Sequence, residues 1–273
     1  MTGSVTVDVG LEALRAHLRE LDRVVVAFSG GADSAFLAWV AHDTLGPERA
    51  HAVTAVSPSL APEEHDDCKS LADLWGLRWT PVITDELAGA AYRANDGDRC
   101  YHCKTELMTA LGPIADEDGA IVVLGVNVDD LGDHRPGQRA ASERGAVFPL
   151  VDAGFTKAQV REASFALGLP TWDKPAAACL ASRVPYGTPG SLSVLTEVAA
   201  AESALRRLGF RQLRVRHYGD LARLELPVDE LDDVLARRQD VVDAVRSAGY
   251  RYVTLDLEGF RSGNLNAALS LGT

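Results

Sequence analysis

The residues best suited to bind an anion form a glycine-rich turn between an apolar run at 24–28 and a helical pattern at 34–45. The turn reads Ser29, Gly30, Gly31, Ala32, Asp33 and Ser34. Adjacent glycines let a backbone approach an anion, and a helix N-terminus adds free N–H groups and partial positive charge. Asp33 can cap the helix or help to hold Mg²⁺. A plain glycine turn is the alternative, but the position directly after a buried strand favours phosphate binding.

The turn belongs to neither of two common phosphate-binding motifs. The GxxxxGK[ST] motif is absent, no lysine lies near the turn in the sequence, and GxGxxG is absent too. The turn therefore predicts an anion site and leaves the reaction open.

Cysteines are the second group of chemically capable residues. Cys100 and Cys103 form a CxxC just before a helical pattern, and Cys179 lies in an irregular segment. The CxxC spacing alone fits a zinc site, a redox pair, an iron–sulfur cluster or an accident. Three thiolates would hold three irons of a [4Fe-4S] cluster and leave the fourth iron open, whereas four thiolates are the usual set. Cys68 lies within a helical pattern and is expected to be a small buried residue.

The segment around Cys179 is rich in proline, glycine and alanine and carries Lys174, Ser182 and Arg183. Nearby cations raise the thiolate fraction of a cysteine, which favours a reactive role for Cys179. A buried cysteine in a packing segment is the alternative.

Further polar residues follow an apolar strand at 121–125. Asn127 and Asp129 come directly after it, and Arg135 lies a few residues beyond. Ligands of open α/β sheets bind beyond the carboxyl ends of the strands, so Asn127 and Asp129 could contact nucleotide, metal or substrate. Arg135 could contact a substrate carboxylate or phosphate. An Asx-rich turn is the alternative.

A pair of arginines alternates on an expected strand at 213–217. Arg214 and Arg216 share one face of that strand and suit a phosphate, unless the face is simply solvated. Glu202, on the preceding helical pattern, could bind a metal, although surface exposure is its default.

The elements that position these residues alternate between strand and helix, which indicates an α/β fold with a parallel sheet. Expected strands lie at 24–28, 52–56, 79–83 and 121–125, and expected helices at 34–45, 63–76, 104–116 and 157–167, the last capped by Thr156. Beyond the irregular segment we expect a helix, two strands, a helix at 229–247 and a strand. The predicted parts are a nucleotide-binding domain (1–171), an irregular active-site loop or linker (172–191) and a smaller α+β domain (192–273).

Composition narrows the class of partner. The chain has 273 residues, of which 47% are hydrophobic and 24% charged, with a net charge of −12. That acidic balance disfavours a large nucleic-acid surface. We find no apolar run long enough for a membrane span and no signal-peptide pattern, so we expect a cytoplasmic protein.

The turn resembles the PP-loop pyrophosphatase superfamily, in which SGGxDS holds the pyrophosphate of ATP. A longer series of segments resembles the LarE family of ATP-dependent sulfur transferases, which act in nickel-pincer cofactor synthesis for lactate racemase. The segments, in order, are VAFSGGADS, NDGDRCYHCK, GVNVDDLGDHRPGQRAASERG, KPAAACLASRVPYG, RVRHYGDLARLEL and DLEGFRSGNLN. They cover most of residues 20–265.

The resemblance implies a PP-loop ATPase domain of the adenine nucleotide alpha-hydrolase type, a C-terminal α+β domain and a homo-oligomer. It also implies adenylylation of the carboxylates of pyridinium-3,5-biscarboxylic acid mononucleotide and their conversion to thiocarboxylates. Matched positions imply the roles that follow. ATP and Mg²⁺ would be bound at the turn, sulfur delivered by Cys179, phosphate bound by Arg214 and Arg216, and a metal contacted by Glu202, with Asp232 or Asp233 as candidates for a second carboxylate.

The family contains two sulfur routes. In one, a lone cysteine gives up its own sulfur; in the other, a CxxC and the loop cysteine hold a [4Fe-4S] cluster carrying an extra sulfide. Because the chain has Cys100, Cys103 and Cys179, the cluster route is favoured. The competing hypotheses are a tRNA-thiolating PP-loop enzyme, an amidotransferase-type synthetase and a non-catalytic ATP-binding regulator.

Overall fold

The computed structural model describes residues 2–132, 136–175 and 178–261. Contacts divide the chain into two compact units. The first unit comprises Met1–Ser57, Glu64–Glu86 and Cys100–Ala177, and the second comprises Pro58–Glu63, Leu87–Arg99 and Ala178–Thr273. The domain boundaries at 171 and 191 stay predictions.

A parallel sheet forms the centre of the first unit, with the strand order β3-β2-β1-β4. Its strands are β1 (Val24–Ala27), β2 (Ala50–Val56), β3 (Arg78–Ile83) and β4 (Ile121–Leu124). In the register, Val24 of β1 lies opposite Ala50 of β2 and Ile121 of β4. The predicted α/β fold with a parallel sheet is therefore confirmed.

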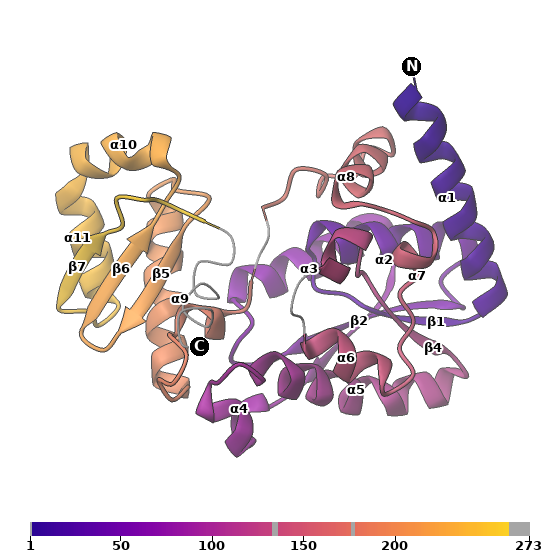
Figure 1. Cartoon of the computed structure of the whole chain (residues 1–273), viewed down its shortest axis with the longest axis horizontal. Coiled ribbons are helices and arrows are strands. Elements are labelled where there is room, and N and C mark those ends of the chain that lie inside the picture. The colour runs from indigo at the N-terminus through magenta and orange to yellow at the C-terminus, as the bar shows by residue number, and fades with distance from the viewer. Residues whose placement is uncertain (1, 133–135, 176–177, 262–273) are drawn as a thin grey trace. The chain divides into compact units, whose positions relative to one another are not determined.

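Helices cover both faces of this sheet (Figure 1). The helices that contribute most residues to the first unit are α1 (Thr2–Leu21), α2 (Ala32–Leu45), α3 (Pro62–Trp75), α5 (Arg99–Asp118), α6 (Pro136–Ser142), α7 (Pro149–Asp152) and α8 (Lys157–Ala166). Val24 and Val26 pack into a core with residues of α1, α2 and α8, whereas Val25 packs against Met108 and Leu111 of α5. Since successive strand residues point to opposite faces, an unbroken apolar strand such as β1 needs a helical layer on each side.

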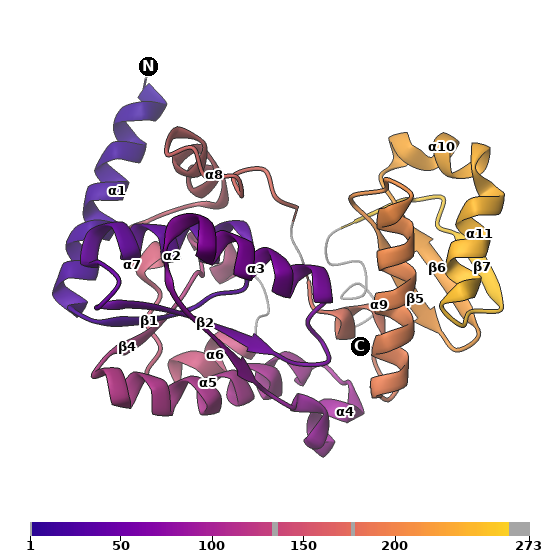
Figure 2. The ribbon, with the colours of Figure 1, turned by 180° about the vertical axis from the view of Figure 1, so that it is seen from behind.

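The second unit contains a smaller sheet with the order β5-β6-β7 (Figure 2). Its strands are β5 (Arg214–Tyr218), β6 (Leu221–Glu225) and β7 (Tyr252–Leu255), and its helices are α4 (Ala90–Ala94), α9 (Leu192–Arg207), α10 (Leu231–Ala236) and α11 (Arg238–Ser247). β5 and β6 are antiparallel, and β7 is parallel to β6. The apolar face, with Val215, Ala222 and Leu224, packs with α9 and α11. The opposite face carries charged side chains.

Three sequence-based expectations need correction. The helix expected at 104–116 begins at Arg99, so the CxxC lies at its N-terminal end and not before it. The helix expected at 229–247 is interrupted, because Arg237 leaves helical geometry between α10 and α11. The N-terminal helix α1 was not expected at all. Across the described ranges, no helix is both long and apolar enough to cross a bilayer.

Candidate functional site

The glycine-rich turn joins β1 to α2 in the first unit and is closed by its two serines. Ser34 Oγ donates to the carbonyl of Gly31 over 3.2 Å and lies 3.1 Å from Ser29 Oγ. The Ser29 N–H donates to Ser34 Oγ over 3.2 Å. These contacts fix the turn directly before the N-terminus of α2. The structure therefore provides a short, well-defined backbone loop of the kind that receives an anion.

Two glycines allow the turn to pack this closely. Gly30 has φ +69°, and a Cβ there would lie 2.9 Å from Cys68 Sγ on α3. Gly125, at the end of β4, would bring a Cβ to 2.7 Å from the Ser34 amide nitrogen. The end of β4 thus rests directly against the first turn of α2. Gly125 was not identified from the sequence as a site residue.

Asp33 is the charged residue of the turn, and two side chains from distant segments hold it. Asn127 Nδ2 donates to Asp33 Oδ1 over 3.3 Å, and Lys157 Nζ forms an ion pair with Asp33 Oδ2. Asp129 Oδ2 accepts from the Lys157 N–H over 2.8 Å. The expectation that Asn127 and Asp129 lie at the carboxyl end of the sheet is met in the geometry. Lys157 was not expected there, because it is distant in the sequence.

Cys68 packs against Gly30 of the turn. It is fully buried, as expected for a small packing residue. Burial raises the pKa of its thiol to about 11. A neutral thiol in this position is chemically unreactive.

The CxxC cysteines lie at the N-terminal end of α5. Cys100 is exposed and Cys103 is half-buried. Cys103 Sγ donates to Glu86 Oε1 over 3.8 Å. Glu86 itself is 8% exposed, and burial raises the pKa of its carboxyl. No sequence pattern pointed to Glu86, because only the tertiary structure brings it into contact with Cys103.

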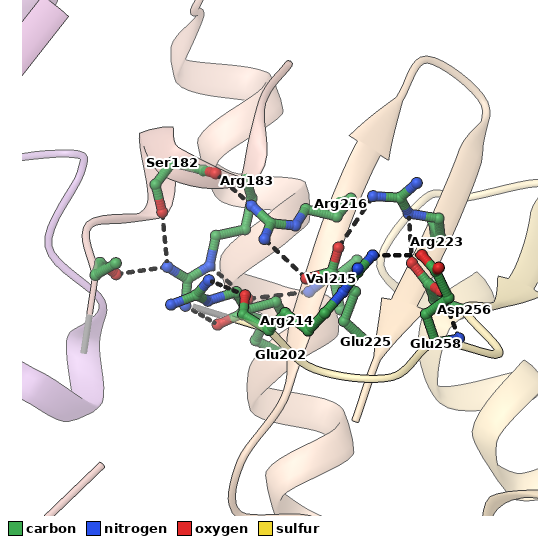
Figure 3. A network of polar contacts seen from close by, with 12 residues as sticks. Ser182, Arg183, Glu202, Arg214, Val215, Arg216, Arg223, Glu225, Asp256 and Glu258 are labelled. Atoms are coloured by element: carbon green, nitrogen blue, oxygen red, sulfur yellow. Dashed lines mark hydrogen bonds and ion pairs between the residues drawn. The ribbon is translucent and has the colours of Figure 1, made fainter. Parts of the chain in front are cut away.

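In the second unit, Arg183 secures the segment that carries Cys179 (Figure 3). Arg183 Nη1 donates to the carbonyls of Ala178 and Cys179 over 2.6 and 3.2 Å. Its Nε and Nη2 contact the two oxygens of Glu202 over 2.7 and 3.1 Å. Burial opposes the charge of Arg183, but Glu202 and the neighbouring Cys179 raise its pKa above the ordinary value. The half-buried Cys179 is therefore placed beside a permanent cation.

Glu202 is fully buried and is saturated by donors. Besides Arg183, it accepts from Arg206 Nη2 over 3.0 Å and from the Val215 N–H over 3.1 Å. A metal ion at Glu202 would have to replace a guanidinium partner, and the metal role stays a prediction. Within the described residues of either unit, no three His, Cys, Asp or Glu side chains come together as a metal site.

Arg214 and Arg216 share the polar face of the small sheet, as expected, but their surroundings differ. Arg216 donates to Glu225 Oε2 and to the Ser182 carbonyl, each over 2.7 Å. Of the carboxylates in the described ranges, none lies within ion-pair distance of Arg214. Burial and the neighbouring arginines lower its pKa to about 10.

A C-terminal segment holds the Arg214 guanidinium in place. The guanidinium lies 4.5 Å from the centroid of the Phe260 ring, and Nη1 is 3.4 Å from the Arg261 carbonyl. Gly259 makes this approach possible, because it has φ +73° and a Cβ there would lie 2.9 Å from the Leu226 carbonyl oxygen. Arg214 is thus a positioned cation with no ion-paired carboxylate among the residues that the structure describes.

The remaining predicted residues are the two aspartates of α10 and Arg135. Asp232 and Asp233 lie on α10, where Asp233 pairs with Arg237 over 3.3 Å. Arg135 lies outside the described residues.

Comparisons with known proteins agree with this geometry. A family model described as NAD synthase matches residues 11–98. A pyridinium-3,5-bisthiocarboxylic acid mononucleotide synthase of Lactiplantibacillus plantarum is 42% identical over 258 residues, which cover 94% of this chain and 94% of that protein. An uncharacterized protein of Synechocystis is 48% identical over 266 residues, covering 95% of this chain and 98% of that protein. A glutamine-dependent NAD(+) synthetase of Aquifex aeolicus is 31% identical over 90 residues, 32% of this chain and 16% of that protein.

The parallel sheet with a glycine-rich turn after β1 defines an ATP-using enzyme of the PP-loop class. The match to the L. plantarum synthase extends over nearly the whole of both chains. The chain therefore belongs to the LarE family of ATP-dependent sulfur transferases.

Proposed function

We propose that this enzyme converts the carboxylates of pyridinium-3,5-biscarboxylic acid mononucleotide into thiocarboxylates at the expense of ATP. The observation that carries the proposal is the full-length similarity to a synthase of the bisthiocarboxylic acid mononucleotide. The closed turn at 29–34 supports it, and so does Arg214, which has no ion pair with any described carboxylate. The reaction needs one site for the ATP phosphates and another for an anionic substrate.

The first proposed step is adenylylation. A carboxylate oxygen of the substrate attacks the α-phosphorus of ATP, and the bond from that phosphorus to the bridging oxygen breaks, releasing pyrophosphate. Donors of the turn stabilise the charge that develops on the leaving pyrophosphate. Asp33, Asn127 and Asp129 offer oxygen ligands of the type that Mg²⁺ prefers, and the bound ion would neutralise phosphate charge.

The second proposed step transfers sulfur. A sulfur nucleophile attacks the acyl carbon, and the carbon–oxygen bond to AMP breaks. Arg183 is fixed beside Cys179, and we assign it to the binding of substrate phosphate. Arg214 binds the phosphate of the mononucleotide, whereas Arg216, already paired with Glu225, contributes at longer range.

The sulfur source in this proposal is a sulfide carried by a [4Fe-4S] cluster. Cys100, Cys103 and Cys179 would ligate three of the irons as thiolates, and none of these three side chains is fully buried. The cluster would supply an open iron that holds the transferable sulfide. The alternative is sacrificial transfer from Cys179 itself. We also expect a cytoplasmic homo-oligomer that acts without nucleic acid.

The deciding experiment combines a pyrophosphate-release assay with anaerobic iron and sulfide analysis. We expect pyrophosphate only when the dicarboxylate mononucleotide is present, and a brown protein that contains iron and acid-labile sulfide. Binding of ATP without pyrophosphate formation would instead favour a regulator. An iron-free protein that is active for one turnover, with loss of one sulfur at Cys179, would replace the cluster route by the sacrificial one.

A further inference from the structure

Two buried polar residues, Asn95 and Arg99, hold the part of the chain that directly follows Cys179. Asn95 ends α4 and is 1% exposed, and Arg99 begins α5 and is 5% exposed. Both belong to the second unit, as do residues 178–190. The steps proposed above give neither residue a role, although polar side chains buried this completely need a reason.

Asn95 organises the loop at 184–190, which lies outside the helices and strands. Its Nδ2 donates to the carbonyls of Pro185 and Thr188, each over 2.8 Å. Its own backbone carbonyl accepts from the Gly187 N–H over 3.0 Å. Asn95 has φ +53°, a left-handed conformation that asparagine adopts more readily than most residues. One residue thus satisfies three backbone groups of an irregular loop.

Arg99 holds the short turn between Cys179 and that loop. Its Nη1 donates to the carbonyl of Ala181 over 2.8 Å and also to Asn95 Oδ1. The guanidinium lies 5.5 Å from the centroid of the Tyr186 ring. Because Arg99 and Asn95 also bind each other, the contacts to the turn and to the loop form one connected network.

This network supplies direction as well as packing. Burial of an amide or a guanidinium is unfavourable unless its polar atoms are hydrogen-bonded. Apolar side chains could fill the same volume, but they cannot fix the orientation of backbone carbonyls. A buried polar network whose members bind one another favours one backbone conformation over its alternatives. The conformation selected here is that of the chain next to Cys179.

We propose that Asn95 and Arg99 are positioning residues, which hold the Cys179 segment in the conformation that sulfur transfer requires. This inference rests on the proposed function and deepens it. Neither residue touches the substrate; both act through the backbone at 180–190. Adenylylation does not need them, because the atoms that react in that step belong to the substrate carboxylate and ATP.

The first measurement is hydrogen exchange of the full-length protein, followed by mass spectrometry on peptides that cover residues 180–190. Asn95→Gly removes the carboxamide, and glycine accepts the left-handed backbone without strain. With one or two hydrogen bonds lost, Asn95→Gly and Arg99→Met should exchange about 5- to 30-fold faster in this segment. Arg99→Lys should stay within about threefold of the unmodified protein, because the ammonium can still donate to the Ala181 carbonyl.

Arg23→Met is the matched control for Arg99→Met. Arg23 also donates to the backbone carbonyls of distant residues, Asp118 over 2.7 Å and Glu48 over 2.9 Å. The same substitution there should leave exchange at 180–190 unchanged, since Arg23 and both of its partners belong to the first unit.

The second measurement separates the two chemical steps in a single turnover of the anaerobically purified protein. Asn95→Gly and Arg99→Met should release pyrophosphate within about twofold of the unmodified rate but form thiocarboxylate about 10- to 100-fold more slowly, the effect of a misplaced reacting group. Arg99→Lys should recover most of the thiocarboxylate rate. A merely structural role would slow both steps together.

Each outcome decides one question. Unchanged exchange at 180–190 in both Asn95→Gly and Arg99→Met would overturn the inference. An unchanged thiocarboxylate rate, or equal slowing of pyrophosphate release and thiocarboxylate formation, would overturn it as well. If the unmodified protein releases no pyrophosphate with the dicarboxylate mononucleotide, the proposed function fails, and the exchange rates still decide whether Asn95 and Arg99 order the segment.

Discussion

Replacement of Gly30 by alanine tests how closely the turn packs on Cys68. The new Cβ would lie 2.9 Å from Cys68 Sγ, at a residue with φ +69°. The left-handed backbone costs about 1–2 kcal/mol for a residue with a Cβ. Overpacking against a buried neighbour adds about 1–3 kcal/mol. We therefore expect Gly30→Ala to lower the free energy of unfolding by about 2–5 kcal/mol.

The two contributions can be separated by a double-mutant cycle with Cys68→Ala. Removal of Sγ relieves the clash but leaves the backbone strain. The double variant should therefore be about 1–3 kcal/mol more stable than the sum of the single changes predicts. Gly31→Ala is the matched control, because its φ is −74° and its new Cβ would lie 3.7 Å from Ser29 Oγ. That change should cost less than about 1 kcal/mol.

The assay is urea unfolding followed by fluorescence, with ATP affinity measured in parallel. The affinity should fall for Gly30→Ala, because the displaced turn no longer presents its N–H groups in register. Additive effects of Gly30→Ala and Cys68→Ala on unfolding would refute the packing argument. Equal destabilisation by Gly30→Ala and Gly31→Ala would refute it as well.

Further predictions concern the cysteine and arginine residues. Cys179→Ala should abolish thiocarboxylate formation and leave the Kd for ATP unchanged; weakened ATP binding would contradict the assigned role. Arg214→Met should raise the melting temperature and should raise the free energy of unfolding by about 1 kcal/mol, because it removes a buried cation that has no ion-paired carboxylate among the described residues. The same change should raise KM for the mononucleotide. A Tm that falls together with an unchanged KM would argue against an anion subsite there. Burial raises the pKa of Glu86, so the folded metal-free protein should lose stability as the pH rises above the ordinary glutamate pKa of about 4.3. Glu86→Gln should flatten that part of the stability profile, measured by urea unfolding from pH 4 to 8, and an unchanged slope would show that Glu86 is not its source.

The sequence by itself determined the local parts of the nucleotide site. An apolar strand, a glycine-rich turn and a helix follow one another directly, so β1, the turn at 29–34 and α2 could be predicted from neighbouring residues. The capping of α8 by Thr156 was predictable for the same reason, since a capping box extends over only four positions. The full-length family resemblance came from segments that remain recognisable without any coordinates.

Tertiary structure decided which distant side chains join those parts. Lys157 reaches Asp33, Glu86 reaches Cys103, and Phe260 lies against Arg214 only because the chain folds back on itself. The difference between Arg216, which has a carboxylate partner, and Arg214, which has none among the described residues, also depends on the placement of β6. The spacing of apolar residues indicates which face of a helix or strand is buried. It does not indicate which residues of other elements pack against that face. Ion pairing, burial and the resulting pKa shifts depend on those contacts, and therefore on the fold.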